Sequence, residues 1–232
     1  MEMEEAADRP DGVELVIFDC DGVLVDSERL TVRIEARLLG ELGWPLTEAE
    51  VVERFVGRSN SYMLSEIERQ LGRPVPEWTP MYRAEQRRSF DEELTAVEGV
   101  LEALAHVEAW GLSTCVASSG THEKMAHTLA LTGLWDRFDG RIYSATQVAE
   151  GKPAPDLFLF AAEQMGVDRT GCVVVEDSPF GIAAATAAGM RSIAYATPLI
   201  ATDKLTDATA VITDLAALPR ALAALPPRGG LA

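Results

Sequence analysis

The chain has 232 residues, of which 47% are hydrophobic and 25% charged, the composition of an ordinary globular protein. Acidic side chains outnumber basic ones by 37 to 20, so the formal net charge is −17 at pH 7. A field of that sign repels DNA and anionic membranes, so we expect neither nucleic acid nor a membrane as a partner. A small anionic substrate fits only if a bound cation and local hydrogen-bond donors offset the field.

Targeting signals and paired cysteines are not evident. Residues 1–10 are acidic and lack the apolar segment of a secretory signal, and no run of about 18 apolar residues predicts a membrane span. Cys20, Cys115 and Cys172 form no C-x-x-C pair, and we interpret them as small buried thiols. These features favour a cytoplasmic protein.

Short apolar runs rich in β-branched residues alternate with helical patterns that end at glycine. Most of the runs are continuous rather than alternating, which is typical of strands covered on both faces. This order predicts an α/β fold with a parallel sheet. The predicted strands are 13–19, 112–118, 141–144, 172–176 and 192–195, with a weaker sixth at 210–213. The predicted helices between them are 99–110, 123–132, 155–165 and 179–188.

The alternation stops between residues 27 and 94, where four helical patterns occur without a convincing strand. Thr47 and Glu50 form a capping box for the second pattern. The third pattern begins near Asn60, and Pro80 occupies the first helical position of the fourth. We interpret this segment as an α-helical cap inserted into the α/β core.

Polar side chains follow four of the predicted strands. Because the carboxyl ends of parallel strands meet at one edge of a sheet, we expect these side chains to lie close together. In chain order they are Asp19 and Asp21, Ser118 and Ser119, Lys152, and Glu176 and Asp177.

This set of side chains predicts phosphoryl transfer. Clustered carboxylates repel one another unless a cation holds them, and Mg²⁺ prefers hard oxygen ligands together with phosphate. Lys152 is placed to neutralise a phosphoryl group, while Ser118 and nearby backbone N–H groups form an anion pocket. Asp19, at the strand end, is the best nucleophile, and Asp21 would protonate the leaving oxygen and later activate water.

Each motif also has a purely structural interpretation. Asp19 and Asp21 could form a turn, Ser118 could cap a helix, Lys152 could lie in a surface turn, and 176–177 could begin a helix. The convergence of all four motifs on one edge favours the functional interpretation.

The sequence resembles the haloacid dehalogenase (HAD) superfamily, in its phosphatase-like branch with a helical cap. The order and spacing of the motifs fit over essentially the whole chain. The resemblance implies a Rossmann-like core of residues 1–26 and 99–232, a helical cap of residues 27–98, and dependence on Mg²⁺. The matching stretches are DCDGVLVDSE (19–28), VASSG (116–120), GKPAPDLF (151–158) and VVEDSPFGIAAATAAGM (174–190).

The same resemblance implies a role for each core residue. Asp19 corresponds to the nucleophile and Asp21 to the general acid/base, and both contribute to the metal site, Asp21 through its main-chain carbonyl. Asp177 corresponds to a metal ligand, with Glu176 as a further ligand or a support. The phosphate-binding residues are Ser118 and Ser119, and the charge-neutralising lysine is Lys152.

The implied activity is that of a Mg²⁺-dependent phosphatase acting on a small phosphorylated metabolite, a sugar phosphate or phosphosugar acid. The alternative is a β-phosphoglucomutase-type phosphosugar mutase, but the cap positions that would hold its assisting histidine are Leu30 and Thr31. Phosphonate hydrolysis needs a cap lysine, and no lysine precedes Lys124. The Asp21 carboxyl argues against dehalogenation. A third alternative is a non-catalytic metabolite-binding protein.

Substrate selection is predicted to lie in the cap loop VGRSN (56–60). Arg58 could grip a second anionic group bidentately, or it could simply be solvated or paired with a cap glutamate. Ser59, Asn60 and Tyr62 could bind substrate hydroxyls. We expect a monomer or a small homo-oligomer.

Overall fold

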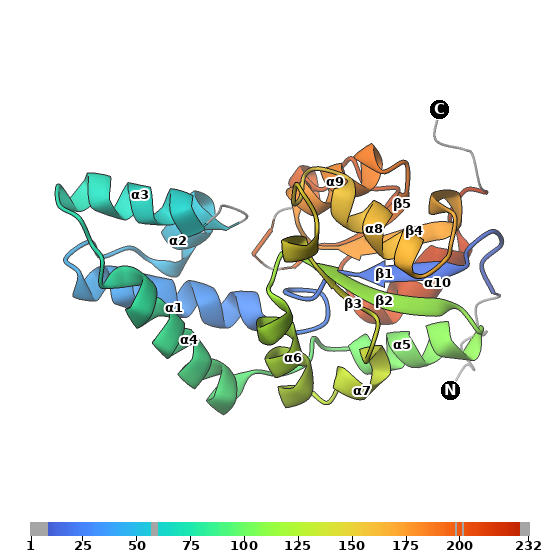
Figure 1. Ribbon diagram of the computed structural model, residues 1–232, viewed down its shortest axis with the longest axis horizontal. Helices are drawn as coiled ribbons and strands as arrows, with labels where there is room; N and C mark the ends of the chain where they lie inside the picture. The colour runs from blue at the N-terminus through green and yellow to red at the C-terminus, as the bar shows by residue number, and fades with distance from the viewer. Residues whose placement is uncertain (1–8, 57–59, 198, 201, 228–232) are drawn as a thin grey trace. The chain divides into compact units, whose positions relative to one another are not determined.

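Two compact units make up the computed structural model, which describes residues 9–56, 60–197, 199–200 and 202–227 (Figure 1). One unit is formed by Met1–Val25 together with Ala96–Ala232, and the other by Asp26–Thr95. The limits of the second unit lie within three residues of the predicted cap, 27–98.

A six-stranded parallel sheet forms the centre of the first unit, in the order β3-β2-β1-β4-β5-β6. All six predicted strands are present, each within two residues of its predicted ends, so the predicted α/β Rossmann-like fold is confirmed. The first strand in sequence lies at the middle of the sheet, between β2 and β4. The strands are β1 (Leu15–Phe18), β2 (Ser113–Ser118), β3 (Ile142–Ser144), β4 (Cys172–Glu176), β5 (Arg191–Tyr195) and β6 (Ala210–Ile212).

Helices cover both faces of this sheet, with α8 and α9 on one face and α5 and α7 on the other (Figure 1). The helices of this unit are α5 (Val100–Ala109), α6 (His122–Leu131), α7 (Trp135–Phe138), α8 (Asp156–Gln164), α9 (Pro179–Ala187) and α10 (Leu218–Ala223). Short 3-10 turns are η1 (Ala145–Gln147), η2 (Arg169–Gly171), η3 (Thr202–Lys204) and η4 (Leu215–Ala217).

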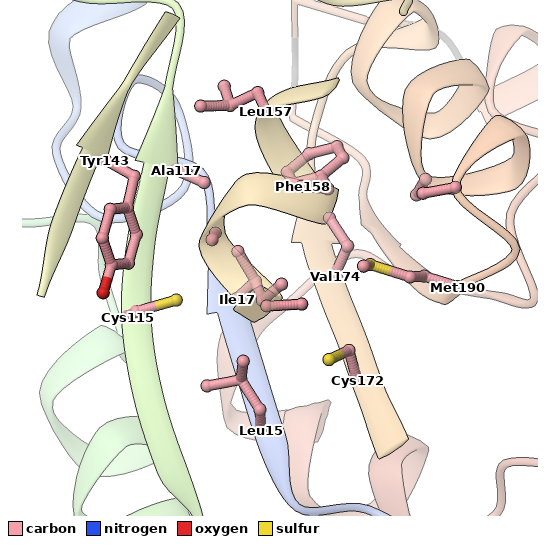
Figure 2. Close-up of a cluster of buried hydrophobic side chains, with 14 of the residues drawn as sticks. Leu15, Ile17, Cys115, Ala117, Tyr143, Leu157, Phe158, Cys172, Val174 and Met190 are labelled. Carbon is pink, nitrogen blue, oxygen red and sulfur yellow. The ribbon is translucent and has the colours of Figure 1, made fainter. Parts of the chain in front are cut away.

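Alternate residues of each strand pack against opposite layers of helices. Leu15 and Ile17 of β1 join a buried cluster with Phe158 of α8 (Figure 2). Phe18 faces the other way and meets Phe138 of α7 edge to face, with ring centroids 6.3 Å apart. Burial on both faces explains why the strand sequences are continuous apolar runs. The three cysteines are also buried, and no disulfide joins them.

The second unit consists of four helices, α1 (Ser27–Glu41), α2 (Glu48–Phe55), α3 (Asn60–Leu71) and α4 (Trp78–Glu93). Helix α1 packs against α2 and α4. The predicted capping box of α2 is present: Glu50 N donates to Thr47 Oγ1 at 3.2 Å, and Thr47 N donates to Glu50 Oε2 at 2.8 Å. Within the described residues, no helix of either unit is long and apolar enough to cross a membrane.

The predicted position of Pro80 is wrong by two residues, because α4 begins at Trp78. Trp78 N donates to Val75 O and Met81 N to Glu77 O, so the helical hydrogen bonds start upstream of the proline. Pro80 still lies in the first turn, where a missing N–H group leaves no helical hydrogen bond unmade.

Glu35 is a buried carboxyl group of α1, only 7% exposed. Burial and the nearby Glu28 carboxylate raise the pKa of Glu35 from 4.5 to about 8. Between about pH 4.5 and pH 8, Glu35 therefore keeps its proton in the folded chain and loses it in the unfolded chain. The stabilisation from this proton is complete below about pH 4.5 and is lost as the pH rises to about 8.

We therefore expect Glu35→Gln to stabilise the protein on the order of 2 kcal/mol at pH 8, with little effect at pH 5. The amide keeps the size of the side chain but needs no proton to stay neutral. Urea unfolding at both pH values measures the difference. Glu53→Gln, at an exposed site on α2, is the matched control. Equal gains for Glu35→Gln at pH 5 and pH 8 would contradict this assignment.

Candidate active site

The ends of three neighbouring strands supply most of the predicted site residues. Asp19 follows β1, Ser118 ends β2, and 176–177 lie at the end of β4. Because β1 pairs with both β2 and β4, these ends are adjacent at one edge of the sheet. Asp19 N also donates to Val175 O at 2.9 Å, which extends the hydrogen bonds between β1 and β4 to Asp19.

Lys152 links these strand ends through its ammonium group. Lys152 Nζ donates to Asp19 Oδ1, to Glu176 Oε1 at 2.7 Å and to the carbonyl of Ala117 at 3.1 Å. Its side chain is only 5% exposed and lies over the ring of Phe158, 4.9 Å from the centroid. The lysine predicted from the loop after the third strand is thus in direct contact with Asp19, which follows β1, and with residues of β2 and β4.

The charges of this cluster depend on one another. Burial alone would lower the pKa of Lys152, but Asp19 and Glu176 outweigh burial and raise it, so the amine stays protonated. Burial raises the pKa of Asp19, Lys152 opposes the rise, and Glu176 and Asp21 add to it. The ammonium is therefore what allows several carboxylates to share a buried edge of the sheet.

Glu176 has protein donors on both of its oxygens. Oε1 accepts from Lys152, while Oε2 accepts from Ser178 N at 2.7 Å and Ser178 Oγ at 2.9 Å. The carboxyl group also lies directly against Gly181 of α9, where an added Cβ would be 1.8 Å from Oε1. This geometry favours Glu176 as the residue that supports Lys152, one of the two roles predicted for it.

Asp177 reaches across to the turn that follows β1. Its side chain is 2% exposed. A Cβ added at Gly22 would lie 2.0 Å from Asp177 Oδ2, so the turn and the carboxylate are in close contact. Gly22 also has φ +79°, a left-handed conformation that favours glycine. Gly22 therefore allows the turn that follows β1 to come into contact with Asp177, the residue after β4.

The oxygen atoms at this edge of the sheet fit Mg²⁺ as ligands. Within the described part of the chain, no three His, Cys, Asp or Glu side chains form a ready-made cage for a metal. Mg²⁺ does not need such a cage, because it is commonly held by one or two carboxylates together with water and phosphate. The site offers two carboxylates and one main-chain carbonyl, those of Asp19 and Asp177 and that of Asp21. Of the four residues predicted to bind the metal, these three are kept, and Glu176 is assigned to supporting Lys152 instead. The metal assignment stays a prediction.

The two serines of the VASSG motif differ in burial. Ser118 is 1% exposed, and its Oγ accepts a hydrogen bond from Gly120 N at 3.1 Å. Ser119 is exposed. Ser118 thus stabilises the loop that leads into α6, and the phosphate-binding role of both serines stays a prediction.

The predicted substrate-selecting residues belong to the cap loop. Arg58 and Ser59 lie outside the described residues. Asn60 is the first residue of α3, and its side chain is exposed. The roles proposed for these three residues stay predictions.

One residue of the site, Lys124 of α6, was not predicted from the sequence. Lys124 Nζ donates to both carboxylate oxygens of Asp21 at 2.8 Å. Burial alone would lower the pKa of Lys124, but Asp21 outweighs burial and raises it. The available signal was the position of Lys124, three residues after the helix-capping Thr121 and just beyond the VASSG motif.

A known protein family matches most of the chain. The model of the haloacid dehalogenase-like hydrolase family matches residues 16–195. The chain belongs to this family. The resemblance seen in the sequence is confirmed, and the match includes Asp19, Lys152 and Asp177 along with the cap.

Similar proteins share most of their length with this member of the family. 6-phosphogluconate phosphatase of Escherichia coli is 34% identical over 77% of this chain and 80% of its own. A haloacid dehalogenase-like protein of unknown function from Agrobacterium tumefaciens is 35% identical, with a TM-score of 0.83 over 91% and 98% of the two chains. A family hydrolase from Deinococcus radiodurans, with bound phosphate and sodium, is 29% identical, with a TM-score of 0.78 over 96% and 100%. The chain is therefore a phosphoric monoester hydrolase of this family.

Gly181→Ala should damage the site through Glu176, because the added methyl carbon would overlap the carboxyl group. We expect a loss of about 1–3 kcal/mol in the free energy of unfolding. We also expect kcat to fall about tenfold or more, since Lys152 loses its alignment. Thermal unfolding and phosphate release measure the two effects.

Gly40→Ala is the matched control, because Gly40 also lies in a helix but nothing lies within 4 Å of its added Cβ. It should be neutral or stabilising by up to about 1 kcal/mol. A Gly181→Ala protein as stable and as active as Gly40→Ala would show that Glu176 has room to move.

Proposed function

We propose that the protein is a Mg²⁺-dependent phosphatase that hydrolyses a small phosphorylated metabolite through an aspartyl-phosphate on Asp19. The observation that carries this proposal is the contact of the Lys152 ammonium with Asp19 at the end of the central strand. The contact supports the proposal because an attacking Asp19 carboxylate would lie beside a positive charge that can also neutralise a phosphoryl group.

The first half of the reaction transfers the phosphoryl group to the enzyme. A carboxylate oxygen of Asp19 attacks phosphorus, the ester P–O bond breaks, and the leaving oxygen takes a proton from Asp21. Lys152 lies where it can offset the charge of the phosphoryl oxygens while Glu176 keeps it in place. Ser118 and the N–H groups of its loop would bind those oxygens.

The second half returns the enzyme to its starting state. Asp21, now a carboxylate, takes a proton from water, and the water oxygen attacks phosphorus. The acyl phosphate bond to Asp19 breaks, which releases inorganic phosphate and restores the Asp19 carboxylate. When bound, Mg²⁺ supplies positive charge that draws the phosphoryl group to the carboxylates and shields it from their repulsion.

The proposed substrate is a sugar phosphate or a phosphosugar acid. Support comes from the name of the Escherichia coli relative, 6-phosphogluconate phosphatase. A protein with a net charge of −17 also needs local cations to bind an anion, and Lys152 and Lys124 provide them at this edge of the sheet. Arg58 would supply a further cation from the cap loop.

Asp19→Asn should abolish phosphate release, by a factor of about 10³ or more, because an amide cannot form the acyl phosphate. Phosphate release with Mg²⁺ across sugar phosphates, sugar-acid phosphates, nucleotides and phosphoglycolate is the measurement. Chelation of Mg²⁺ should also abolish phosphate release by the wild-type protein. The control is an unchanged circular dichroism spectrum. Substantial turnover by Asp19→Asn would end the nucleophile assignment.

The β-phosphoglucomutase-type mutase remains the second candidate, since it would use the same strand-end residues. The cap sequence favours hydrolysis, because Leu30 and Thr31 stand where the resemblance implies the assisting histidine of the mutase. Comparing isomer formation with phosphate release separates the two activities. Tight metabolite binding without any turnover would instead indicate the non-catalytic binding protein.

A further inference from the structure

Lys124 and Asp21 form a direct ion pair at the edge of the sheet that carries the site. Lys124 Nζ lies 2.8 Å from Oδ1 and 2.8 Å from Oδ2 of Asp21, although the residues are 103 positions apart in the chain. The side chains are 32% and 22% exposed, so the pair borders solvent and can be reached by a substrate.

The backbone of Lys124 is held in place by the first turn of α6. Lys124 N donates to Oγ1 of the capping Thr121 at 3.2 Å, and Thr128 Oγ1 donates to the Lys124 carbonyl at 3.1 Å. The lysine stem passes close to Gly120, since its Cδ would lie 3.6 Å from a Cβ built there. The ammonium is therefore presented to Asp21 from an anchored helix rather than from a mobile loop.

The lysines are distributed in an unusual way. The chain has only three, Lys124, Lys152 and Lys204, and two of them bind the two aspartates assigned to the reaction. Lys152 contacts Asp19, and Lys124 contacts Asp21, so each reacting carboxylate has an ammonium of its own. The ammonium limits where the Asp21 oxygens can lie, and one oxygen can carry a proton while the other keeps its hydrogen bond to Lys124.

We propose that Lys124 is a positioning residue, which holds the Asp21 carboxyl group in the orientation needed for proton transfer to the leaving oxygen. The proposal rests on the proposed function, because Lys124 acts only through the proton transfer assigned to Asp21. A general acid contributes about 10²–10⁴ to the rate, and it does so only while it is correctly oriented.

The test compares two esters that differ in their need for a proton. A sugar phosphate releases an alkoxide, which needs protonation, whereas p-nitrophenyl phosphate releases a phenolate that leaves without it. Lys124→Met should lower kcat/KM for the sugar phosphate about 10- to 100-fold and that for p-nitrophenyl phosphate by less than about threefold. The parameter kcat/KM is used because it reports on the first phosphoryl transfer.

Two further variants separate positioning from direct contact with substrate. Adding Lys124→Met to Asp21→Asn should cause no further loss, because the lysine would have nothing left to orient. Lys124→Arg keeps a positive charge beside Asp21 but changes the shape of the donor, so its preference between the two esters should lie between those of the wild type and Lys124→Met. Lys204→Met, at an exposed lysine of η3, should leave both esters unaffected.

An equal loss for both esters, or a full additional loss in the double variant, would show that Lys124 binds the phosphoryl group itself and would overturn the proposal. No loss at all would also overturn it. If Lys124→Met does not fold, Lys124→Gln takes its place with the same expected difference between the two esters, and an equal loss for both esters in that variant counts against the proposal. A wild-type protein without phosphatase activity would instead contradict the proposed function. Failure of the Lys124 proposal and failure of the proposed function are therefore distinguishable.

Discussion

The buried ammonium of Lys152 is the interaction on which the rest of the site depends. Asp19, Glu176 and Asp177 are each no more than 6% exposed and gather at neighbouring strand ends, where unpaired carboxylates would repel one another. Lys152 contacts two of these carboxylates and the main chain of β2. Removing one partner from a buried charge cluster is costly, because it leaves the remaining charge without compensation. The same contacts that stabilise the edge of the sheet therefore hold Asp19, the proposed nucleophile, in place.

The packing around this cluster explains how an acidic chain can accommodate an anion. The overall charge of −17 opposes the approach of a phosphorylated molecule. Lys152 and Lys124 offset part of the negative charge that the carboxylates bring to this edge of the sheet, and bound Mg²⁺ would offset more of it. Gly22 and Gly181 supply the complementary condition, because the absence of a side chain lets Asp177 and Glu176 come within contact distance of the backbone. The positive charges of the lysines and the space left by the two glycines together allow the carboxylates to gather at this edge of the sheet.

Much of this arrangement could be predicted from the sequence, for a simple reason. The ends of parallel strands share one edge, so strand prediction alone places Asp19, Ser118 and Asp177 together. The loop lysine was predicted from the motif order. Other features depend on three-dimensional fit. The Lys124–Asp21 pair requires the angle at which α6 leaves the sheet, and the closure of Glu176 against Gly181 requires the path of α9. The local sequence pattern predicts neither the angle of α6 nor the path of α9. Pro80 shows the same limit on a smaller scale, because it is compatible with several positions in a first turn.

The central position of β1 has a consequence for how the protein matures. Its two neighbours begin at Ser113 and Cys172, and the helical unit Asp26–Thr95 lies between β1 and both of them in the chain. During synthesis Asp19 emerges well before its partner Lys152, which lies 133 residues further along the chain, and Asp177 follows later still. Contacts this distant in sequence form late, and the nascent chain exposes an unpaired central strand until then. Asp19 therefore lacks its ammonium partner until the segment that carries Lys152 has been made and the sheet has formed around β1.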